Sequence, residues 1–229
     1  MLSPRLKQVA AFVSYAAVLA DIGSDHAYLP CALALDGRIA KAYAAEVKEG
    51  PLKQSKKTIA QYELEDKVFP LLSDGLANIP DDVDEVVIAG MGAHTVLAIL
   101  QASFARLPNY KRIIIQVNQH MELIRAYLNE HQFMILEEAL VQEEDKYYPI
   151  LVWQATQDRI LRPEEILFGP KLLEQHADLF HEFYQKRYQA YEAILPQLLP
   201  GSDRYQQLAQ EMHLMQTHIL EKKRVERNT

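Results

Sequence analysis

The 229-residue sequence contains one cysteine, Cys31, so no disulfide can form within the chain. A lone thiol fits the reducing cytoplasm, which is where we expect this protein to be located. Without a cysteine cluster the common structural zinc sites are excluded, and the sequence predicts no metal site. The buried position expected of a free cysteine gives Cys31 a packing role rather than a chemical one.

Long hydrophobic runs are also missing. The longest, residues 9–20, is interrupted by Ser14 and Tyr15 and is too short to span a bilayer. Arg5 and Lys7 are followed by no distinct apolar core and cleavage site, so we expect no secretory signal. The sequence therefore predicts no membrane contact.

An excess of basic residues is absent as well. The net charge is −7, of which −6 falls in residues 1–155 and −1 in residues 156–229. Proteins that bind nucleic acid usually carry a basic excess, because phosphate contacts dominate their affinity. Composition therefore excludes an overall basic surface and leaves room only for a local basic patch. Hydrophobic residues make up 49% of the chain, which is enough to bury a full-sized core.

What the sequence does contain is a regular alternation of apolar runs and helical patterns. Five buried strands are expected, over residues 16–22, 41–47, 68–72, 85–89 and 113–117. Helical patterns are expected over residues 28–35, 51–62, 94–100 and 121–130. Such alternation predicts a doubly wound, Rossmann-like α/β domain with a parallel sheet. Two further runs, residues 133–141 and 148–153, have no helix between them and are expected to form an antiparallel pair at one edge, giving seven strands.

The pattern changes after Trp153, and we place a domain boundary between residues 157 and 158. Two apolar stripes at helical spacing flank a turn over residues 200–203, where Ser202 is the expected N-cap. Residues 158–229 are therefore predicted to form a coiled-coil-like α-helical hairpin. The stripes consist of Leu173, Phe180, Tyr184, Arg187, Tyr191, Ile194 and Leu198, and of Tyr205, Leu208, Met212, Met215 and Ile219.

The turn after the first strand carries acids where a dinucleotide-binding turn carries glycines. It contains Asp21, a single Gly23, Asp25 and His26, instead of the G-x-G-x-x-G pattern. A carboxylate about 4 Å from a pyrophosphate would cost roughly 1–4 kcal/mol in repulsion. S-adenosylmethionine has no phosphate and presents an ammonium and a sulfonium, so the acidic turn favours this cofactor over NAD. His26 is expected to form hydrogen bonds within the turn.

The next two strands also end in acids. Glu46 can accept hydrogen bonds from both ribose hydroxyls, and Asp74, followed by Gly75, can accept one from the adenine amino group. A single acid at a strand end is most often a cap or a solvated loop residue. Three in chain order indicate one binding site for the cofactor.

The fourth and fifth strands end in small and amide residues. Gly90, Met91 and Gly92 allow the backbone to approach a ligand closely, although a tight turn alone would also explain them. Asn118 can orient the edge of a base, or equally cap the helix that starts near Met121. The sequence leaves both alternatives open.

Together these motifs resemble the bacterial tRNA (adenine-22-N1)-methyltransferase family, TrmK. The most specific motif is the run of residues 21–30, DIGSDHAYLP, and it is joined by residues 73–75, 90–92 and 168–170. The resemblance covers nearly the whole chain. Ala93 and Val117 depart from the family pattern of glycine and proline at these positions.

The resemblance implies a class I methyltransferase domain over residues 1–157 that transfers a methyl group from S-adenosylmethionine to N1 of adenine 22 in tRNA. It implies that Asp25 favours the cationic product base, that Asn118 holds the base, and that Tyr28 stacks on it. Phosphates would be bound by Lys186 and Arg187, which gives the helical hairpin a role in gripping tRNA. Whether the protein is a monomer or a homodimer stays open.

Several alternatives compete with this hypothesis. The hairpin can serve only for packing or dimerisation, and the enzyme can act on a small molecule or a protein. A non-enzymatic RNA-binding protein with a retained cofactor pocket is a further alternative. His26 and His94 could also be catalytic, or could bind a metal together with Asp21 and Asp25, but their spacing matches no known ligand pattern. Other basic residues that could extend a patch for RNA are Arg5, Lys7, Lys53, Lys56, Lys57, Lys222, Lys223, Arg224 and Arg227.

Overall fold

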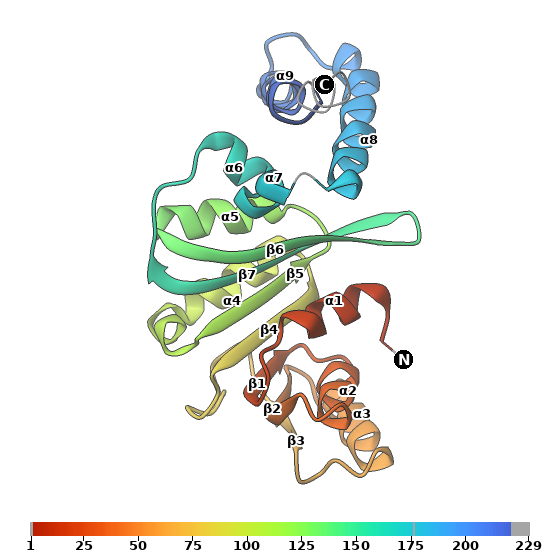
Figure 1. Ribbon diagram of the computed structural model, residues 1–229, viewed down its shortest axis with the longest axis vertical. Helices are drawn as coiled ribbons and strands as arrows, with labels where there is room; N and C mark the ends of the chain where they lie inside the picture. The colour runs from red at the N-terminus through yellow and green to blue at the C-terminus, as the bar shows by residue number, and fades with distance from the viewer. Residues whose placement is uncertain (1, 176, 221–229) are drawn as a thin grey trace. The chain divides into compact units, whose positions relative to one another are not determined.

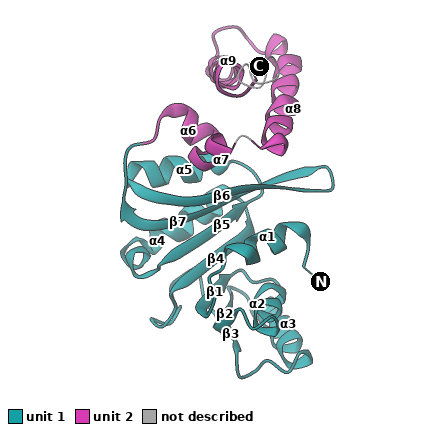
Figure 2. Cartoon of the chain, viewed as in Figure 1, with its two compact units in different colours: residues 1–160 teal, residues 161–229 magenta. Residues whose placement is uncertain are grey.

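The computed structural model describes residues 2–175 and 177–220 (Figure 1). The chain divides into two compact units, residues 1–160 and 161–229, which are coloured separately in Figure 2. The sequence places this boundary three residues earlier. The basic tail at residues 222–227 lies outside the described residues.

The first unit is built on one seven-stranded sheet, as the sequence predicts. Its strand order is β3-β2-β1-β4-β5-β7-β6. Strands β1 to β5 run parallel to one another, and β7 pairs antiparallel with both β5 and β6. The expected antiparallel edge pair is therefore confirmed. The strands are β1 (Ala17–Ile22), β2 (Ile39–Glu46), β3 (Val68–Leu72), β4 (Glu85–Met91), β5 (Arg112–Val117), β6 (Phe133–Glu143) and β7 (Lys146–Gln157).

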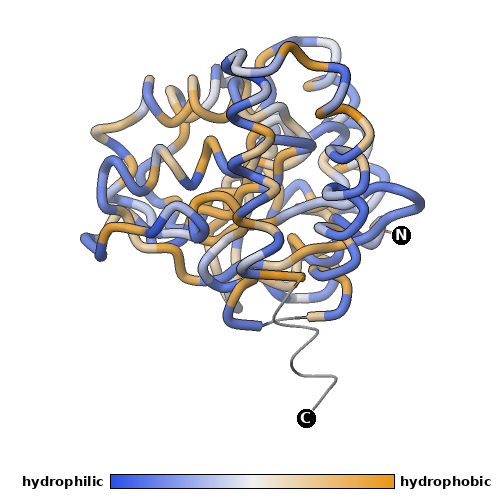
Figure 3. The backbone as a smooth tube through the Cα atoms, turned by 90° about the horizontal axis from the view of Figure 1, so that it is seen from above, coloured by the Kyte–Doolittle hydropathy of each residue, from blue (hydrophilic) through white to orange (hydrophobic). Residues whose placement is uncertain are grey.

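Helices cover both faces of this sheet. Right-handed crossovers run in opposite directions on the two sides of the β1–β4 pair, so α2 and α3 cover one face and α4 and α5 the other. Figure 3 shows hydrophilic and apolar stretches alternating along the helical coils, as amphipathic helices require. The bounds are α2 (Tyr28–Leu35), α3 (Glu49–Gln61), α4 (Ala93–Ala102) with the 3-10 helix η1 (Phe104–Asn109), and α5 (Met121–Glu130).

The central strands form the core because both of their faces are covered. Residues 86–88 of β4 and residues 113–115 of β5 are fully buried. Each such aliphatic side chain contributes about 1.5–3 kcal/mol on leaving water. These runs cross the middle of the sheet and hold its carboxyl edge rigid, where the strand-end residues lie.

One helix was not predicted from the sequence. Helix α1 (Pro4–Phe12) precedes β1 and contacts α2, β5, β6 and β7. Its start carries a recognisable signal, since Ser3 accepts a hydrogen bond from the amide of Leu6 at 3.4 Å and Pro4 occupies the first turn. The amphipathic pattern that identifies most helices is weak here, because Val9 is the one fully buried residue within it.

The second unit contains the two long helices expected there, α8 (Asp178–Ile194) and α9 (Asp203–Met215), which contact each other. Ser202 caps α9 as predicted, accepting a hydrogen bond from the amide of Tyr205 at 3.3 Å. The placement of Leu173 in the first long helix was wrong, because Pro170 starts a separate short helix. The remaining elements are α6 (Pro163–Phe168), α7 (Pro170–Gln175), η2 (Leu195–Gln197) and the π-helical turn η3 (Gln216–Leu220).

A polar network joins the two long helices. Arg187 of α8 donates from Nη2 to Glu211 Oε2 of α9 at 3.2 Å, and from Nε to the Tyr191 hydroxyl at 2.9 Å. The Tyr191 hydroxyl in turn donates to Glu211 at 2.9 Å. The guanidinium of Arg187 is therefore engaged between the helices.

None of the described helices is both long and apolar enough to cross a membrane.

Helix α5 is tied to β6 by a buried ion pair, which generates a stability prediction. Arg125 Nε lies 2.7 Å from Glu138 Oε1, and their side chains are 3% and 0% exposed. Arg125→Leu leaves a buried carboxylate without its cation and should lower the free energy of unfolding by about 3–5 kcal/mol. Urea unfolding followed by the fluorescence of Trp153, the single tryptophan and a buried one, measures this.

The double variant Arg125→Leu with Glu138→Leu should recover most of that loss, since no charge is left buried. Lys111→Ala is the matched control, because Lys111 pairs with Asp84 at 3.1 Å on the surface and should contribute less than about 1 kcal/mol. An Arg125→Leu loss no larger than that of the control would contradict the prediction.

Candidate active site

The turn after β1 brings the ends of three strands together. Gly23 has a φ of +66°, and its amide donates to the carbonyl of Ala45 in β2 at 2.9 Å. A side chain at this position would overlap the Cε atom of Met91, which reaches across from the end of β4. The positive φ favours glycine here, whereas the tip of the flexible Met91 side chain could move aside for a Cβ.

Three non-glycine residues follow in the left-handed region. The φ angles of Asp25, His26 and Ala27 are 41°, 73° and 59°, and Ala27 then begins α2 without a side-chain cap. Each such residue costs roughly 1–2 kcal/mol. Glu46 Oε1 accepts a hydrogen bond from the Asp25 amide at 2.7 Å and helps to hold the turn in this shape. Strain of this kind is concentrated at functional sites.

Two carboxylates lie buried side by side beneath this turn. Asp21 is 4% exposed and Glu46 is 6% exposed. Burial raises the pKa of Asp21 from 3.8 to about 7; the Ser24 hydroxyl, which donates to Asp21 at 2.6 Å, opposes the rise, and the charge of Glu46 adds to it. Burial also raises the pKa of Glu46, against the effect of the Asp25 amide. A cationic ligand would stabilise both ionised carboxylates, and an anionic one would be repelled.

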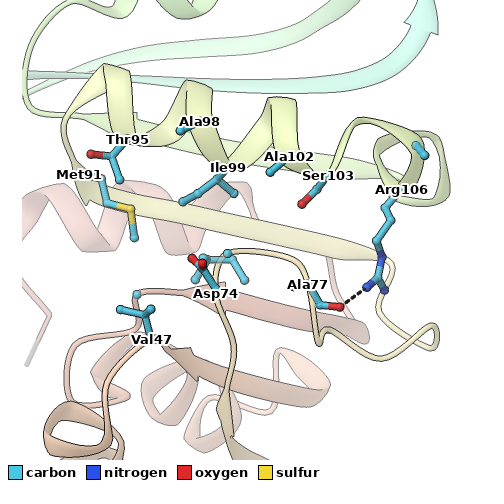
Figure 4. Close-up of a pocket in the computed structure, with 14 residues that line it drawn as sticks. Val47, Asp74, Ala77, Met91, Thr95, Ala98, Ile99, Ala102, Ser103 and Arg106 are labelled. Carbon is cyan, nitrogen blue, oxygen red and sulfur yellow. Dashed lines mark hydrogen bonds between the residues drawn. The ribbon is translucent and has the colours of Figure 1, made fainter.

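A cavity of about 560 Å³ opens beside this turn (Figure 4). Val47 and Asp74 line one side, and Met91 and the face of α4 that carries Ile99 line the other. Most of the wall is apolar, with the Asp74 carboxylate as its acidic group. This combination suits a flat aromatic ring that carries an amino group. The further lining residues are Ile22, Gly23, Gly75, Ala77, Thr95, Ala98, Ala102, Ser103, Ala105 and Arg106.

The shape of the cavity depends on Gly75 and Arg106. A Cβ on Gly75, whose φ is +54°, would lie 3.0 Å from Cγ2 of Ile99 and narrow the opening. Arg106 fixes the loop after β3 by donating to the carbonyls of Leu76 at 2.9 Å and Ala77 at 3.1 Å. No sequence pattern singles out Val47, although it directly follows Glu46, or the lining residues of α4 and η1.

The ends of β4 and β5 are joined by side-chain amides. Asn118 donates from Nδ2 to the Gly90 carbonyl at 3.2 Å, and its own amide donates to the Met91 carbonyl at 3.1 Å. The alternative that Asn118 caps α5 was wrong, because His120 occupies that position, with a φ of 64° and no capping bond from its side chain. Asn118 is exposed, and the structure places it at the Gly90 turn.

Two parallel aromatic rings extend the strained turn. The rings of His26 and Tyr28 stack with centroids 5.5 Å apart and planes 6° apart, and Tyr28 is half exposed. His26 Nε2 lies 3.4 Å from the Asp25 carboxylate, whose side chain is 86% exposed. Buried Nδ1 of His26 has no partner among the described residues. The stacked rings of His26 and Tyr28 therefore present a flat aromatic surface near the turn.

The structure thus brings together most of the residues expected at the site. Asp21, Gly23, Asp25, His26 and Glu46 form the turn and its buried base; Asp74, Gly75 and Met91 line the cavity; Gly90 and Gly92 flank Met91. Lys186 and Arg187 belong to the second unit. In the described part of the chain no group of three or more histidine, cysteine, aspartate or glutamate side chains could hold a metal ion.

Comparison with known proteins decides the family. The profile of the family described as "TrmK: tRNA (adenine(22)-N(1))-methyltransferase" matches residues 19–224. The chain belongs to the TrmK family. The match includes the Gly23 turn, the cavity and most of the helical second unit.

Individual relatives are similar to this chain over nearly its whole length. The tRNA (adenine(22)-N(1))-methyltransferase of Bacillus subtilis is 32% identical over 230 residues, covering 95% of this chain and 97% of that one. A Streptococcus pneumoniae structure in complex with S-adenosyl-L-methionine is 34% identical, with a TM-score of 0.87, over 96% of this chain and 100% of that one. M. capricolum TrmK in complex with S-adenosyl-homocysteine is 28% identical, with a TM-score of 0.85, over 96% and 98%.

The buried carboxylate of this TrmK member generates a pH prediction. Because the pKa of Asp21 is about 7 in the folded chain and 3.8 is its ordinary value, ionising Asp21 above pH 7 costs stability on the order of 4 kcal/mol. Asp21→Asn should therefore raise the free energy of unfolding at pH 8, and the gain should shrink as the pH falls from 7 to 4. Urea unfolding without ligand across this range measures the gain.

Asp74→Asn is the control, because Asp74 is an exposed carboxylate at another strand end and its substitution should change stability by less than about 0.5 kcal/mol. A gain for Asp21→Asn that is equal at pH 5 and pH 8 would show that Asp21 is not the titrating group.

Proposed function

We propose that this TrmK member transfers the methyl group of S-adenosylmethionine to N1 of adenine 22 in tRNA. The observation that carries the proposal is the Gly23 turn, where two buried carboxylates adjoin a largely apolar cavity. An ammonium and a sulfonium suit that electrostatic environment, and a pyrophosphate does not.

The residues of the cavity fit this cofactor. Among the lining residues, the exposed side chain of Val47 covers a face of the adenine, and Asp74 accepts a hydrogen bond from the adenine amino group. Glu46 does not line the cavity itself but directly precedes Val47, and it accepts the ribose hydroxyls. Asp21 and the strained turn face the cationic end of the ligand. The complexes of S. pneumoniae and M. capricolum relatives with S-adenosyl-L-methionine and S-adenosyl-homocysteine support the same choice.

The chemistry requires positioning more than acid or base catalysis. The bound cofactor supplies a methyl group activated by a positive sulfur. Adenine N1 has an in-plane lone pair, so it can form its bond to the methyl carbon while the carbon–sulfur bond breaks, and no proton has to be removed first. Holding N1 in line with that carbon is the main contribution that the protein can make.

Residues around the cavity can hold the base in that position. The exposed face of Tyr28, stacked on His26, offers a surface for the extruded adenine, and Asn118 can bind its edge from the Gly90 turn. The solvent-exposed Asp25 carboxylate favours the positive charge that the product base acquires. Asp25 and Asn118 are accordingly the catalytic candidates, and Tyr28 is a substrate-binding one.

The tRNA contacts of the second unit are a separate part of the proposal. Lys186 lies 2.8 Å from Glu182, and both side chains are at least half exposed, so an RNA phosphate can compete for this lysine. Arg187 is committed to Glu211 and Tyr191, which gives it a structural role in the hairpin. With tRNA as the substrate, a location in the cytoplasm follows.

The decisive experiment uses labelled S-adenosylmethionine with unmodified tRNA, in parallel with a tRNA in which adenine 22 is replaced by guanine. We expect label in the first tRNA and none in the second. Equal labelling of both would place the methyl group elsewhere. Cofactor binding without transfer to either would favour a small-molecule or protein substrate, which the net charge of −7 would suit.

The role of Glu46 gives a second prediction. Glu46→Gln keeps the shape of the side chain but weakens its hydrogen bonds to the ribose, and bonds to a charged group contribute about 1.5–3 kcal/mol. The Kd for S-adenosyl-homocysteine, measured calorimetrically, should therefore rise at least about tenfold. Glu49→Gln, an exposed position at the start of α3, is the control and should leave the Kd unchanged. An unchanged Kd for Glu46→Gln would remove Glu46 from the cofactor site.

A further inference from the structure

Helix α1, which precedes the sheet in the chain, places an arginine at the carboxyl edge of the strands. Figure 1 shows α1 on the side where the β6–β7 hairpin projects, and α1 contacts β5, β6 and β7. The backbone amide of Arg5 donates to Glu143 Oε2, near the end of β6, at 3.0 Å. This amide bond, together with Ser3 and the charge of Arg5, lowers the pKa of Glu143. The start of α1 is thereby fixed to the sheet.

The side chain of Arg5 is fixed as firmly as its backbone. Its Nη1 donates to Gln116 Oε1 of β5, and its guanidinium lies 5.4 Å from the ring centroid of Tyr148 in β7. The same Nη1 is 3.5 Å from the position that a Cβ on Gly90 would occupy. A Cβ at Gly90 would thus only touch the guanidinium, so this distance places Arg5 in direct contact with the β4 turn, and the φ of +80° is what favours glycine there.

Gln116 is the buried link in this arrangement. It is fully buried, and its Oε1 also accepts the amide of Gly90 at 2.9 Å. One oxygen thus joins the arginine of α1 to the turn that carries Met91 into the cofactor cavity. The Nε2 of Gln116 is buried without a partner among the described residues. Burying the amide nitrogen of Gln116 without a hydrogen bond costs free energy, which indicates that this side chain is kept for a role in the site rather than for packing in the core.

We propose that Arg5 binds a phosphate of the RNA backbone next to the target adenosine, and that Gln116 is the positioning residue that aims it. The inference rests on the proposed function. Of the guanidinium nitrogens of Arg5, only Nη1 is bonded within the described part of the chain, and the residue is partly exposed. The remaining N–H groups form the planar fork that matches a phosphate.

The charge of the chain makes such a residue necessary. With a net charge of −7, an RNA strand approaching the carboxylates of Asp21, Asp25 and Glu46 meets repulsion, and a fixed cation at the entrance offsets it. The exposed lysines of α1 and α3 carry charge on flexible stems, whereas Arg5 is held in one orientation. A pre-positioned arginine loses less conformational entropy on binding.

The test compares Arg5→Gln and Arg5→Lys with Lys67→Gln, which removes an exposed cation just before β3, at the opposite end of the strands. Arg5→Gln should raise the KM for tRNA about tenfold or more and reduce the slope of log affinity against log salt by about one. Arg5→Lys keeps the charge and should preserve the slope while raising the KM less. Both should keep the Kd for S-adenosyl-homocysteine within about twofold, and Lys67→Gln should leave the KM, the salt slope and the Kd close to wild type.

Gln116→Met tests the positioning role. It should raise the KM for tRNA, and its effect should not add to that of Arg5→Gln, because each change removes the same contact. Additive effects would show that Gln116 does not act through Arg5. Melting temperatures show whether each variant is folded, and Arg5→Lys carries the test if Arg5→Gln is not.

An unchanged KM for tRNA and an unchanged salt slope in Arg5→Gln would overturn the inference, since Arg5 would then only anchor α1. An increase in the Kd for S-adenosyl-homocysteine as large as the increase in KM would overturn it as well. If the wild-type protein transfers no methyl group to tRNA, the proposed function itself fails, and this inference fails with it.

Discussion

The burial of Asp21 and Glu46 at the ends of adjacent strands is the constraint on which the site depends. Their carboxyl groups are kept from water by the turn that follows β1, and that turn keeps its shape partly because Glu46 binds its backbone. Ionising both groups is unfavourable until a cation is present. The folded chain therefore favours cationic ligands at this position, and the parallel sheet holds the two carboxylates in place.

A second constraint is the close approach of the β1 and β4 turns. Met91 reaches Gly23, and Gln116 binds Gly90, so a disturbance at either turn changes the wall of the cofactor cavity and the place where the base must lie. Because α1 is attached to the same glutamine, the amino-terminal helix becomes part of the site although it precedes every strand of the sheet. Under the proposed function, the cofactor and the target base therefore depend on the same few contacts of Met91 and Gln116 with the two turns.

Much of this architecture was predictable from the sequence, because apolar runs and turn residues determine it locally. The positions of the seven strands along the chain, the antiparallel edge pair and the acids at three strand ends all follow from patterns within a few residues, whereas the order of the strands in the sheet depends on how the chain crosses over. Helix α1 was not predictable in the same way, since its single buried residue gives too weak a period. The roles of Val47, Ile99 and Gln116 depend on contacts between distant segments, which no local pattern encodes.

The left-handed backbone conformation of residues 25–27 has a consequence for how substitutions there would change the stability of this protein. A screen that rewards heat resistance alone would favour glycine at these three positions, because glycine adopts such angles without steric penalty. Each replacement would remove a carboxylate, an imidazole or the rigid entry to α2. Under the proposed function, thermal stability and recognition of the base place opposite demands on these three residues, so selection for one is expected to reduce the other.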